Sequence, residues 1–182
     1  MGELKPRSAP ALRPLDQTAG NRRGGVGPAA KTDEQDRTIG RTTVTDAMND
    51  WNRKVIEEFR SNGGKVGGQF EGAPMLLLST TGAHSGQPRT HPMMYLADGD
   101  HIYVFASKAG APTNPDWYHN LKANPTVTVE IGTEKRQARA EEVTGPERDR
   151  IYAKQSARYP GFAEYQEKST RTIPVVELVG TS

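Results

Sequence analysis

A turn near the middle of the chain contains several side chains that suit an anionic ligand. The stretch STTGAHSGQPRTHP, residues 79–92, has more glycines, hydroxyls and basic groups than a hairpin turn needs. Gly86 allows backbone N–H groups to turn toward a ligand, and Ser85 adds a hydroxyl. Arg89 suits bidentate contact with a phosphate or carboxylate, and His84 adds a donor or a charge. This turn therefore predicts one wall of an anion site.

Two nearby stretches extend that prediction. ASKAGAP puts Ser107 and Lys108 at the end of a predicted strand and continues into a turn that contains glycine. NPDWYHNL offers Trp117 and Asn120 on one short helix, where an aromatic face can support a planar ring and an amide can fix its polar edge. Together the three stretches predict a site for an anionic ligand that carries a ring.

Each of these residues also has a purely structural explanation. Glycines in a turn often only form the turn, and Trp117 on a helix is more often a core residue. His91 and His119 are predicted to be a structural and a surface histidine. No two of the four histidines have the i, i+4 spacing of a helical zinc site, so no metal is predicted. A dinucleotide-binding fingerprint, a P-loop and a GxSxG nucleophile elbow are also missing.

The elements that position these stretches follow from apolar periodicity and turn signals. A helix is predicted through residues 48–61, capped by Thr45 or Asp46 and ended by Asn62-Gly63-Gly64. The remaining order is three strands, a helix, two strands, two helices and a strand, over residues 74–81, 91–98, 101–107, 115–124, 126–132, 135–143, 145–160, 161–169 and 174–179. Hairpin connections dominate, so we predict an α+β fold with an antiparallel sheet or small barrel and flanking helices.

Composition divides the chain near residue 47. Residues 1–47 hold eight Lys/Arg, six Asp/Glu and no aromatic residue, whereas residues 48–182 hold sixteen of each charge and every aromatic residue. A segment so poor in large apolar side chains cannot offset its ordering entropy, so residues 1–47 are predicted to be a disordered extension. Two alternatives stay open, a basic arm that touches a membrane or nucleic acid and a native start at Met48. Residues 48–182 are predicted to form one domain.

The whole-chain composition narrows the function classes. A formal charge of +2 argues against a dedicated nucleic-acid binder. The absence of cysteine removes disulfides, thiolate metal sites and cysteine nucleophiles. No apolar run is long enough to span a membrane. We expect a cytoplasmic protein, with weak association at the inner face of the membrane as a further expectation and the oligomeric state left open.

Three runs of the sequence resemble the deazaflavin-dependent nitroreductase family. They are LLLSTTGAHSGQPRTHPMMYLADGD, FASKAGAPTNPDWYHNLKANPTVTVEI and RYPGFAEYQEKSTRTIPVVEL, and the similarity extends from about Met48 to Val179. The resemblance implies a split β-barrel of the FMN-binding type. It also implies coenzyme F-420, an 8-hydroxy-5-deazaflavin that carries a phosphate and an oligoglutamate tail.

The resemblance assigns expected roles to the residues of the three stretches. The phosphate and tail would be held by His84, Arg89 and Lys108. The full set expected to bind the cofactor is His84, Ser85, Gly86, Arg89, Lys108, Trp117 and Asn120. The groups expected to line the substrate side are Ser107, Tyr159 and Tyr165.

This sequence departs from the family pattern at two of the expected positions. His84 stands where relatives commonly have Lys or Arg, and a neutral imidazole holds a phosphate less strongly. Phe162 stands where some members that reduce nitro drugs have Tyr, so a donor is missing there. The second departure argues against reduction of nitroimidazoles.

The expected activity is hydride transfer from the reduced deazaflavin to an electrophilic small molecule. A quinone, an enone or a nitroaromatic would suit as electron acceptor. Two other classes of function stay open. One is a protein that binds or sequesters a deazaflavin or lipid without turnover, and the other is an FMN- or haem-dependent enzyme on the same fold.

Overall fold

The computed structural model describes residues 44–181. The prediction that residues 1–47 are disordered concerns mainly residues 1–43, and these lie outside the described residues. Helix α1 begins at Val44, so Thr45 and Asp46 lie within it and do not cap it. The elements are α1 Val44–Ser61, β1 Met75–Thr81, β2 Pro88–Met94, β3 Leu96–Asp98, β4 His101–Phe105, α2 Asp116–Ala123, β5 Thr126–Ile131, β6 Glu134–Val143, α3 Gly145–Arg158, α4 Gly161–Lys168 and β7 Val175–Gly180. Two short 3-10 helices, η1 Gly68–Phe70 and η2 Lys108–Gly110, lie between them.

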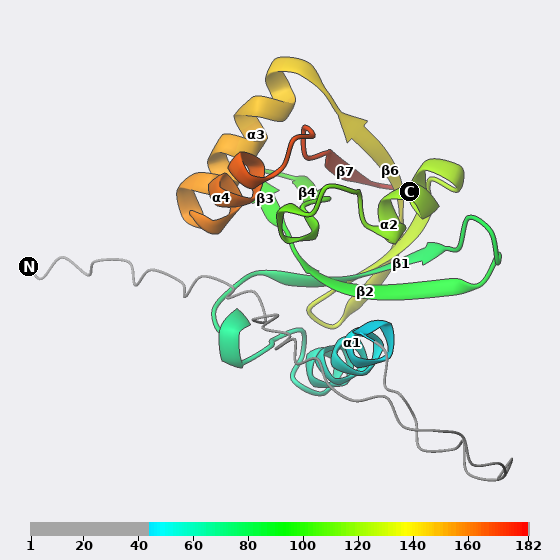
Figure 1. The fold of residues 1–182 in the computed structure, drawn as a ribbon. Coiled ribbons are helices and arrows are strands. Elements are labelled where there is room, and N and C mark those ends of the chain that lie inside the picture. The colour runs from blue at the N-terminus through cyan, green and yellow to red at the C-terminus, as the bar shows by residue number, and fades with distance from the viewer. Residues whose placement is uncertain (1–43, 182) are drawn as a thin grey trace, which may run out of the picture.

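The seven strands form one antiparallel sheet in the order β2-β1-β5-β6-β7-β4-β3. The chain passes from β2 at one edge to β3 at the other through the single residue Tyr95. Because Met94 and Leu96 are only two positions apart, the two edges must lie side by side, and the sheet curls into a barrel (Figure 1). The curled sheet with its flanking helices confirms the predicted α+β split-barrel fold. The single strand predicted over residues 91–98 is wrong, because Tyr95 divides it into β2 and β3.

The interior of the barrel is filled by alternate residues of five strands and closed by α2. Val104 of β4 and Ala106 just after it point inward, whereas Tyr103 and Phe105 point outward, as the period of two in a strand requires. The outer cluster consists of Leu96, Tyr103, Phe105, Ile151, Tyr152, Phe162, Ile173 and Val175. Helix α2 contributes two further side chains to the interior. The inner cluster consists of Leu76, Leu78, Val104, Ala106, Trp117, Leu121, Val127, Val129, Ala138, Ala140, Val176 and Leu178.

Helices cover the outside of the barrel in two places. Val55 and Phe59 of α1 pack on Met75 and Leu77 of β1, while α3 and α4 cover β4 and β7 (Figure 1). Strand β1 is therefore apolar on both faces, which explains the unbroken run from Met75 to Leu78. These layers leave the ends of the strands, where the basic turns lie, as the polar part of the fold.

Candidate functional site

The loop between β1 and β2 is a compact hairpin turn with two unused backbone donors. The Gly82 N–H donates to the Gln87 carbonyl at 2.8 Å, and the Gly86 N–H donates to the Gly82 carbonyl at 2.9 Å. Gly86 has a φ of 67°, a conformation that favours glycine. The Ser85 hydroxyl accepts the Gln87 N–H at 3.2 Å. Within residues 44–181 the N–H groups of His84 and Ser85 have no acceptor, so they are available to an anion.

Asn120 of α2 fixes this loop from behind. Its side chain is 8% exposed, its Oδ1 accepts the Ala83 N–H at 2.9 Å, and its Nδ2 donates to Thr80 Oγ1 at 3.2 Å. Thr80 is opposite Arg89 in the register of β1 and β2. Both polar ends of the amide are thus used inside the protein. Each end of the amide keeps one further donor or acceptor site, so the direct contact with the cofactor that the resemblance implies stays a prediction.

The second basic turn follows β4 and has an uncommon backbone conformation. Lys108 has a φ of 45° and Ala109 a φ of 52°, in the left-handed region that residues with a Cβ rarely adopt. The Gly110 N–H closes the turn by donating to the Ser107 carbonyl at 2.9 Å. A Cβ on Gly110 would lie 3.1 Å from the Tyr165 carbonyl oxygen, so the turn packs closely against α4.

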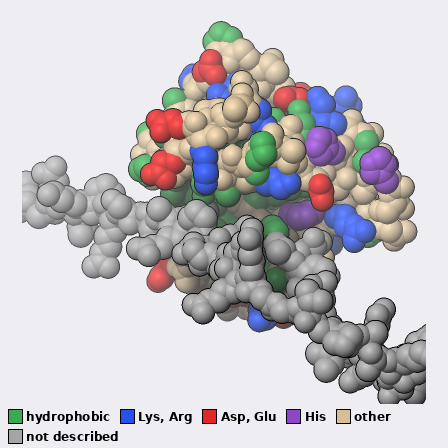
Figure 2. Space-filling model, viewed as in Figure 1, with side chains coloured by type: hydrophobic (Ala, Val, Ile, Leu, Met, Phe, Trp, Pro, Cys, Tyr) green, Lys and Arg blue, Asp and Glu red, His purple; other side chains and the backbone are tan. Residues whose placement is uncertain are grey.

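Cations around these turns have no carboxylate partner within the described part of the chain, among them Arg89, Lys108, Lys168 and Arg171. Among residues 44–181 the Lys108 ammonium donates to the Thr113 hydroxyl alone, at 3.2 Å. Arg150 of α3, by contrast, contacts the carboxylates of Asp98 and Glu147. On the face shown in Figure 2, histidine side chains lie close to Lys and Arg side chains. Cations left without acids are typical of a surface that binds an anion.

The described residues fit a cofactor that carries phosphate and carboxylate groups. The two free N–H groups of His84 and Ser85 and the side chains of Arg89 and Lys108 are donors that no carboxylate of residues 44–181 pairs with. Trp117, predicted as a support for the ring of the ligand, is 7% exposed and packs in the inner cluster. For Trp117 the structural explanation holds, because an amphipathic helix that closes a barrel must bury its largest apolar side chain.

The residues predicted to line the substrate side lie on α4, at the end of α3 and beside η2. The Tyr165 main chain contacts Gly110, three positions after Ser107, so the structure brings this tyrosine and this serine into one region. Burial raises the pKa of Tyr165. Tyr159 is partly buried and packs on the same outer cluster. Phe162 is 9% exposed and meets the Tyr165 ring edge-on at 5.5 Å, so it is a core side chain.

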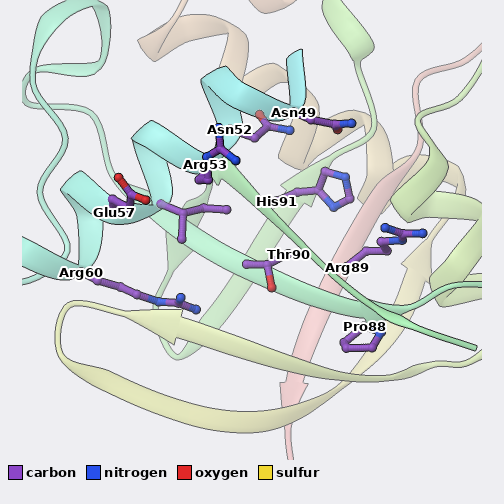
Figure 3. A pocket seen from close by; sticks show the side chains of 10 residues that line it. Asn49, Asn52, Arg53, Glu57, Arg60, Pro88, Arg89, Thr90 and His91 are labelled. Carbon is purple, nitrogen blue, oxygen red and sulfur yellow. The ribbon is translucent and has the colours of Figure 1, made fainter. Parts of the chain in front are cut away.

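A hollow of about 370 Å³ lies between α1 and β2 and reaches the predicted anion site (Figure 3). Arg89 belongs to both, whereas His91, which was predicted to be structural, lines only the hollow. In the close-up both side chains project from β2. The Nδ1 atom of His91 is buried and has no hydrogen-bond partner within residues 44–181. The hollow is lined by Asn49, Asn52, Arg53, Ile56, Glu57, Arg60, Pro88, Arg89, Thr90 and His91.

Burial of His91 predicts a loss of stability in acid. Burial lowers the pKa of His91 below its ordinary value of 6.5, the charge of Asp116 opposes this shift, and the charge of Arg89 adds to it. The unfolded chain therefore binds a proton more readily, so this contribution to stability is present above 6.5 and is lost as the pH falls through that value. We predict that the melting temperature of His91→Gln falls less than that of the parent between about pH 7 and about pH 5. Parallel melting curves over that interval would contradict the prediction.

The sequence analysis missed Arg171 and Asn114. Arg171 donates to the Ser107 carbonyl, the Ala111 carbonyl and Asn114 Oδ1, so it ties the loop after β4 to the segment before β7. The signal for Arg171 in the sequence is the run RTIPV, which is part of the third stretch that resembles the family. Contacts across 57 and more residues of sequence cannot be read from spacing alone.

Comparison with known proteins defines the class. The sequence model of the F-420H(2)-dependent quinone reductase family matches residues 51–179. An F-420H(2)-dependent quinone reductase of Mycobacterium tuberculosis is 40% identical over 126 residues, which are 66% of this chain and 83% of that protein. A second protein of that organism, named a putative F-420H(2)-dependent quinone reductase, is 35% identical over 105 residues, 58% of this chain and 88% of the relative.

Two solved structures resemble the protein in both sequence and fold. One is an F-420-H2-dependent reductase with a TM-score of 0.54 and 42% sequence identity. The match covers 58% of this chain and 93% of the chain of that reductase. The other is described as a domain-swapped dimer and has a TM-score of 0.55 and 36% sequence identity. That match covers 75% of this chain and 99% of the chain of the other protein.

The protein is thus an oxidoreductase of the split-barrel type, which confirms the predicted class, fold and deazaflavin coenzyme. The chain belongs to the F-420H(2)-dependent quinone reductase family. Within residues 44–181, none of the helices has the length and apolar character needed to cross a membrane.

Proposed function

We propose that the protein transfers a hydride from reduced coenzyme F-420 to a quinone-type electron acceptor, and that its two basic turns bind the acidic part of the coenzyme. The observation that carries the proposal is that neither Arg89 nor Lys108 has a carboxylate partner within residues 44–181, while the β1–β2 loop offers free N–H groups in the same part of the chain. The family membership supports the coenzyme, and the names of the relatives support the acceptor.

The residues of the β1–β2 loop and of η2 divide the binding between them. The N–H groups of His84 and Ser85 would donate to phosphate oxygens, with Gly86 allowing the loop to turn. Arg89 and Lys108 would bind the phosphate and the carboxylates of the tail as charged donors.

The substrate side is proposed to hold the acceptor next to the reactive ring and to help deliver a proton. The reduced coenzyme supplies the hydride from its ring carbon C5, and a quinone needs one further proton to become a hydroquinone. Since burial raises the pKa of Tyr165, its phenol is protonated near neutral pH and can donate a hydrogen bond to the acceptor. Tyr159 and the Ser107 hydroxyl are the other groups proposed to contact it.

A quinone suits this proposed site better than a nitroimidazole does. Phe162 is packed among Phe105, Tyr152 and Tyr165 in the outer cluster. It brings no hydroxyl to the substrate side, where some nitro-reducing members have a tyrosine. The loss of that donor weakens recognition of a nitro group, whereas a quinone oxygen can use the tyrosines that remain.

The acceptor is tested by oxidation of the reduced coenzyme in the presence of a quinone, an enone and a nitroimidazole. We predict fastest oxidation with the quinone, and a rise in nitroimidazole rate for Phe162→Tyr that leaves the affinity for the oxidised coenzyme unchanged. Oxidation with the nitroimidazole as fast as with the quinone would contradict the proposed substrate class. Binding without turnover of any acceptor would favour a sequestering protein, and copurified FMN or haem would favour the other enzyme class.

Membrane association and the cytoplasmic location stay predictions. Quinones that carry long apolar tails reside in membranes, so a weak association of the enzyme with the inner membrane face would bring it to its acceptor. Sedimentation with anionic liposomes of the full chain against a chain that starts at Met48 tests this, because the eight Lys/Arg of residues 1–47 are present only in the first.

A further inference from the structure

The turn that carries Lys108 has two adjacent residues in a backbone conformation that neither prefers. Lys108 and Ala109 have φ values of 45° and 52°, and both have a Cβ. For such residues the left-handed conformation is disfavoured, because the Cβ comes too close to the following carbonyl oxygen. A strained conformation of this kind persists only when the surrounding structure holds it in place. The question is therefore which group holds this turn.

Arg171 makes the contacts that hold it. Its Nη2 donates to the Ser107 carbonyl at 3.0 Å, and its Nε donates to the Ala111 carbonyl at 3.1 Å. Its Nη1 donates to Asn114 Oδ1 at 2.6 Å. The guanidinium thus fixes one carbonyl on either side of the strained pair and a side chain further along the loop. Its planar fork sets these three positions relative to one another, which a lysine ammonium cannot do.

This arrangement also sets the direction of the Lys108 N–H. The Ser107 carbonyl accepts from both Arg171 and the Gly110 N–H. In a trans peptide the C=O and the N–H point in opposite directions, so the Lys108 N–H points away from the guanidinium. Within residues 44–181 the N–H groups of Lys108 and Ala109 have no acceptor. The turn therefore presents two backbone donors together with the Lys108 ammonium.

Arg171 adds a charge that the described residues do not neutralise. It contacts two carbonyls and an amide, and no carboxylate is within ion-pair distance in this part of the chain. Arg148, the other partly buried arginine of this region, does contact a carboxylate, that of Asp149. A guanidinium stays protonated in proteins, so Arg171 leaves a positive charge directly behind the turn.

We propose that Arg171 is a positioning residue that holds the Ser107–Asn114 loop in its strained conformation, so that the backbone N–H groups of Lys108 and Ala109, and not only the lysine ammonium, bind the anionic part of the coenzyme. This inference rests on the proposed function. It assigns to Arg171 no contact with the coenzyme. It predicts that strain in the turn and affinity for the coenzyme are coupled through the guanidinium.

The test combines Arg171→Lys with Ala109→Gly. Arg171→Lys keeps the charge but loses the fork, and it should weaken binding of the oxidised coenzyme on the order of tenfold. It should also speed hydrogen exchange at the Gly110 and Ala111 amides, which close the turn by donating to the Ser107 and Lys108 carbonyls. Glycine adopts positive φ without penalty, so Ala109→Gly in the Arg171→Lys background should recover on the order of fivefold of the lost affinity. Ala109→Gly alone should leave the affinity near that of the parent.

The outcomes separate a positioning residue from a merely structural one. A melting temperature that falls while affinity stays the same, or a loss of affinity that Ala109→Gly does not recover, would overturn the proposal. Arg150→Lys is the matched control and should change neither affinity nor exchange in the turn. If Arg171→Lys does not fold, Asn114→Ala takes its place, since it removes one hold on the guanidinium, and the same recovery is expected. Failure of the parent protein to bind the coenzyme would overturn the proposed function itself.

Discussion

Replacing Lys108 by Gln should weaken binding of the oxidised coenzyme on the order of 10- to 100-fold, and Arg89→Gln should have an effect of similar size. Each change removes a charge-assisted hydrogen bond to the phosphate or tail, and such a bond contributes about 1.5–3 kcal/mol. Neither side chain supports the fold through an ion pair, because neither has a carboxylate partner among the described residues. The melting temperature should therefore hardly change. Fluorescence titration with the coenzyme and a thermal melt measure the two quantities separately.

The salt dependence of the same titration gives the control. The affinity of the parent should fall as the salt concentration rises, and each variant should show a shallower fall because it has one charge contact fewer. Lys135→Gln, on the exposed β5–β6 hairpin, removes the same charge far along the chain from both turns and should leave the affinity and its salt dependence unchanged. A loss of affinity in the Lys135 variant equal to that in the Lys108 variant would mean that net charge, rather than the turns, determines binding.

Gln155→Met should stabilise the protein by about 1–3 kcal/mol, the cost of a buried polar group without a partner. Gln155 lies on the inner side of α3, is 0% exposed, and has no hydrogen-bond partner for either its Oε1 or its Nε2 within residues 44–181. Methionine has nearly the same length and no polar group to satisfy, so it fits the same space without that cost. Urea unfolding of the two proteins measures the difference as a change in the midpoint.

Gln166→Met provides the matched contrast. The Gln166 amide is fully used, since Oε1 accepts from Arg148 and from the Ile173 N–H, and Nε2 donates to the Arg171 carbonyl. The same substitution there should destabilise the protein. If Gln155→Met also lowers the unfolding midpoint, the Gln155 amide has a partner in solution and its burial is not a cost.

The sequence was sufficient for most of the architecture because the alternation of apolar residues is local. The two faces of β4 and the doubly buried run of β1 follow directly from the order of apolar residues. The division of residues 91–98 into two strands could not be predicted in this way. The residue types near Tyr95 do not mark the point where one edge of the sheet meets the other. That break depends on closure of the whole barrel.

The candidate site was predicted in part, for the same reason. Its exposed donors, His84, Ser85 and Lys108, lie in short turns that the sequence marks with glycine and basic residues. The groups that hold these turns are Asn120 and Arg171, and they act across 37 or more residues of sequence. Their roles appear only when the structure shows which polar atoms are already bonded.

The most direct test of the central claim is a titration of the full chain with oxidised coenzyme F-420 against the same coenzyme with its tail and phosphate removed. Binding through the two basic turns predicts saturable binding of the intact coenzyme, weakened by salt, and much weaker binding of the truncated ring. It also predicts that Lys108→Gln lowers the affinity for the intact coenzyme and leaves that for the truncated ring unchanged. Equal affinity of the parent for both ligands would contradict the assignment of Arg89 and Lys108 as the groups that bind the anionic part of the coenzyme.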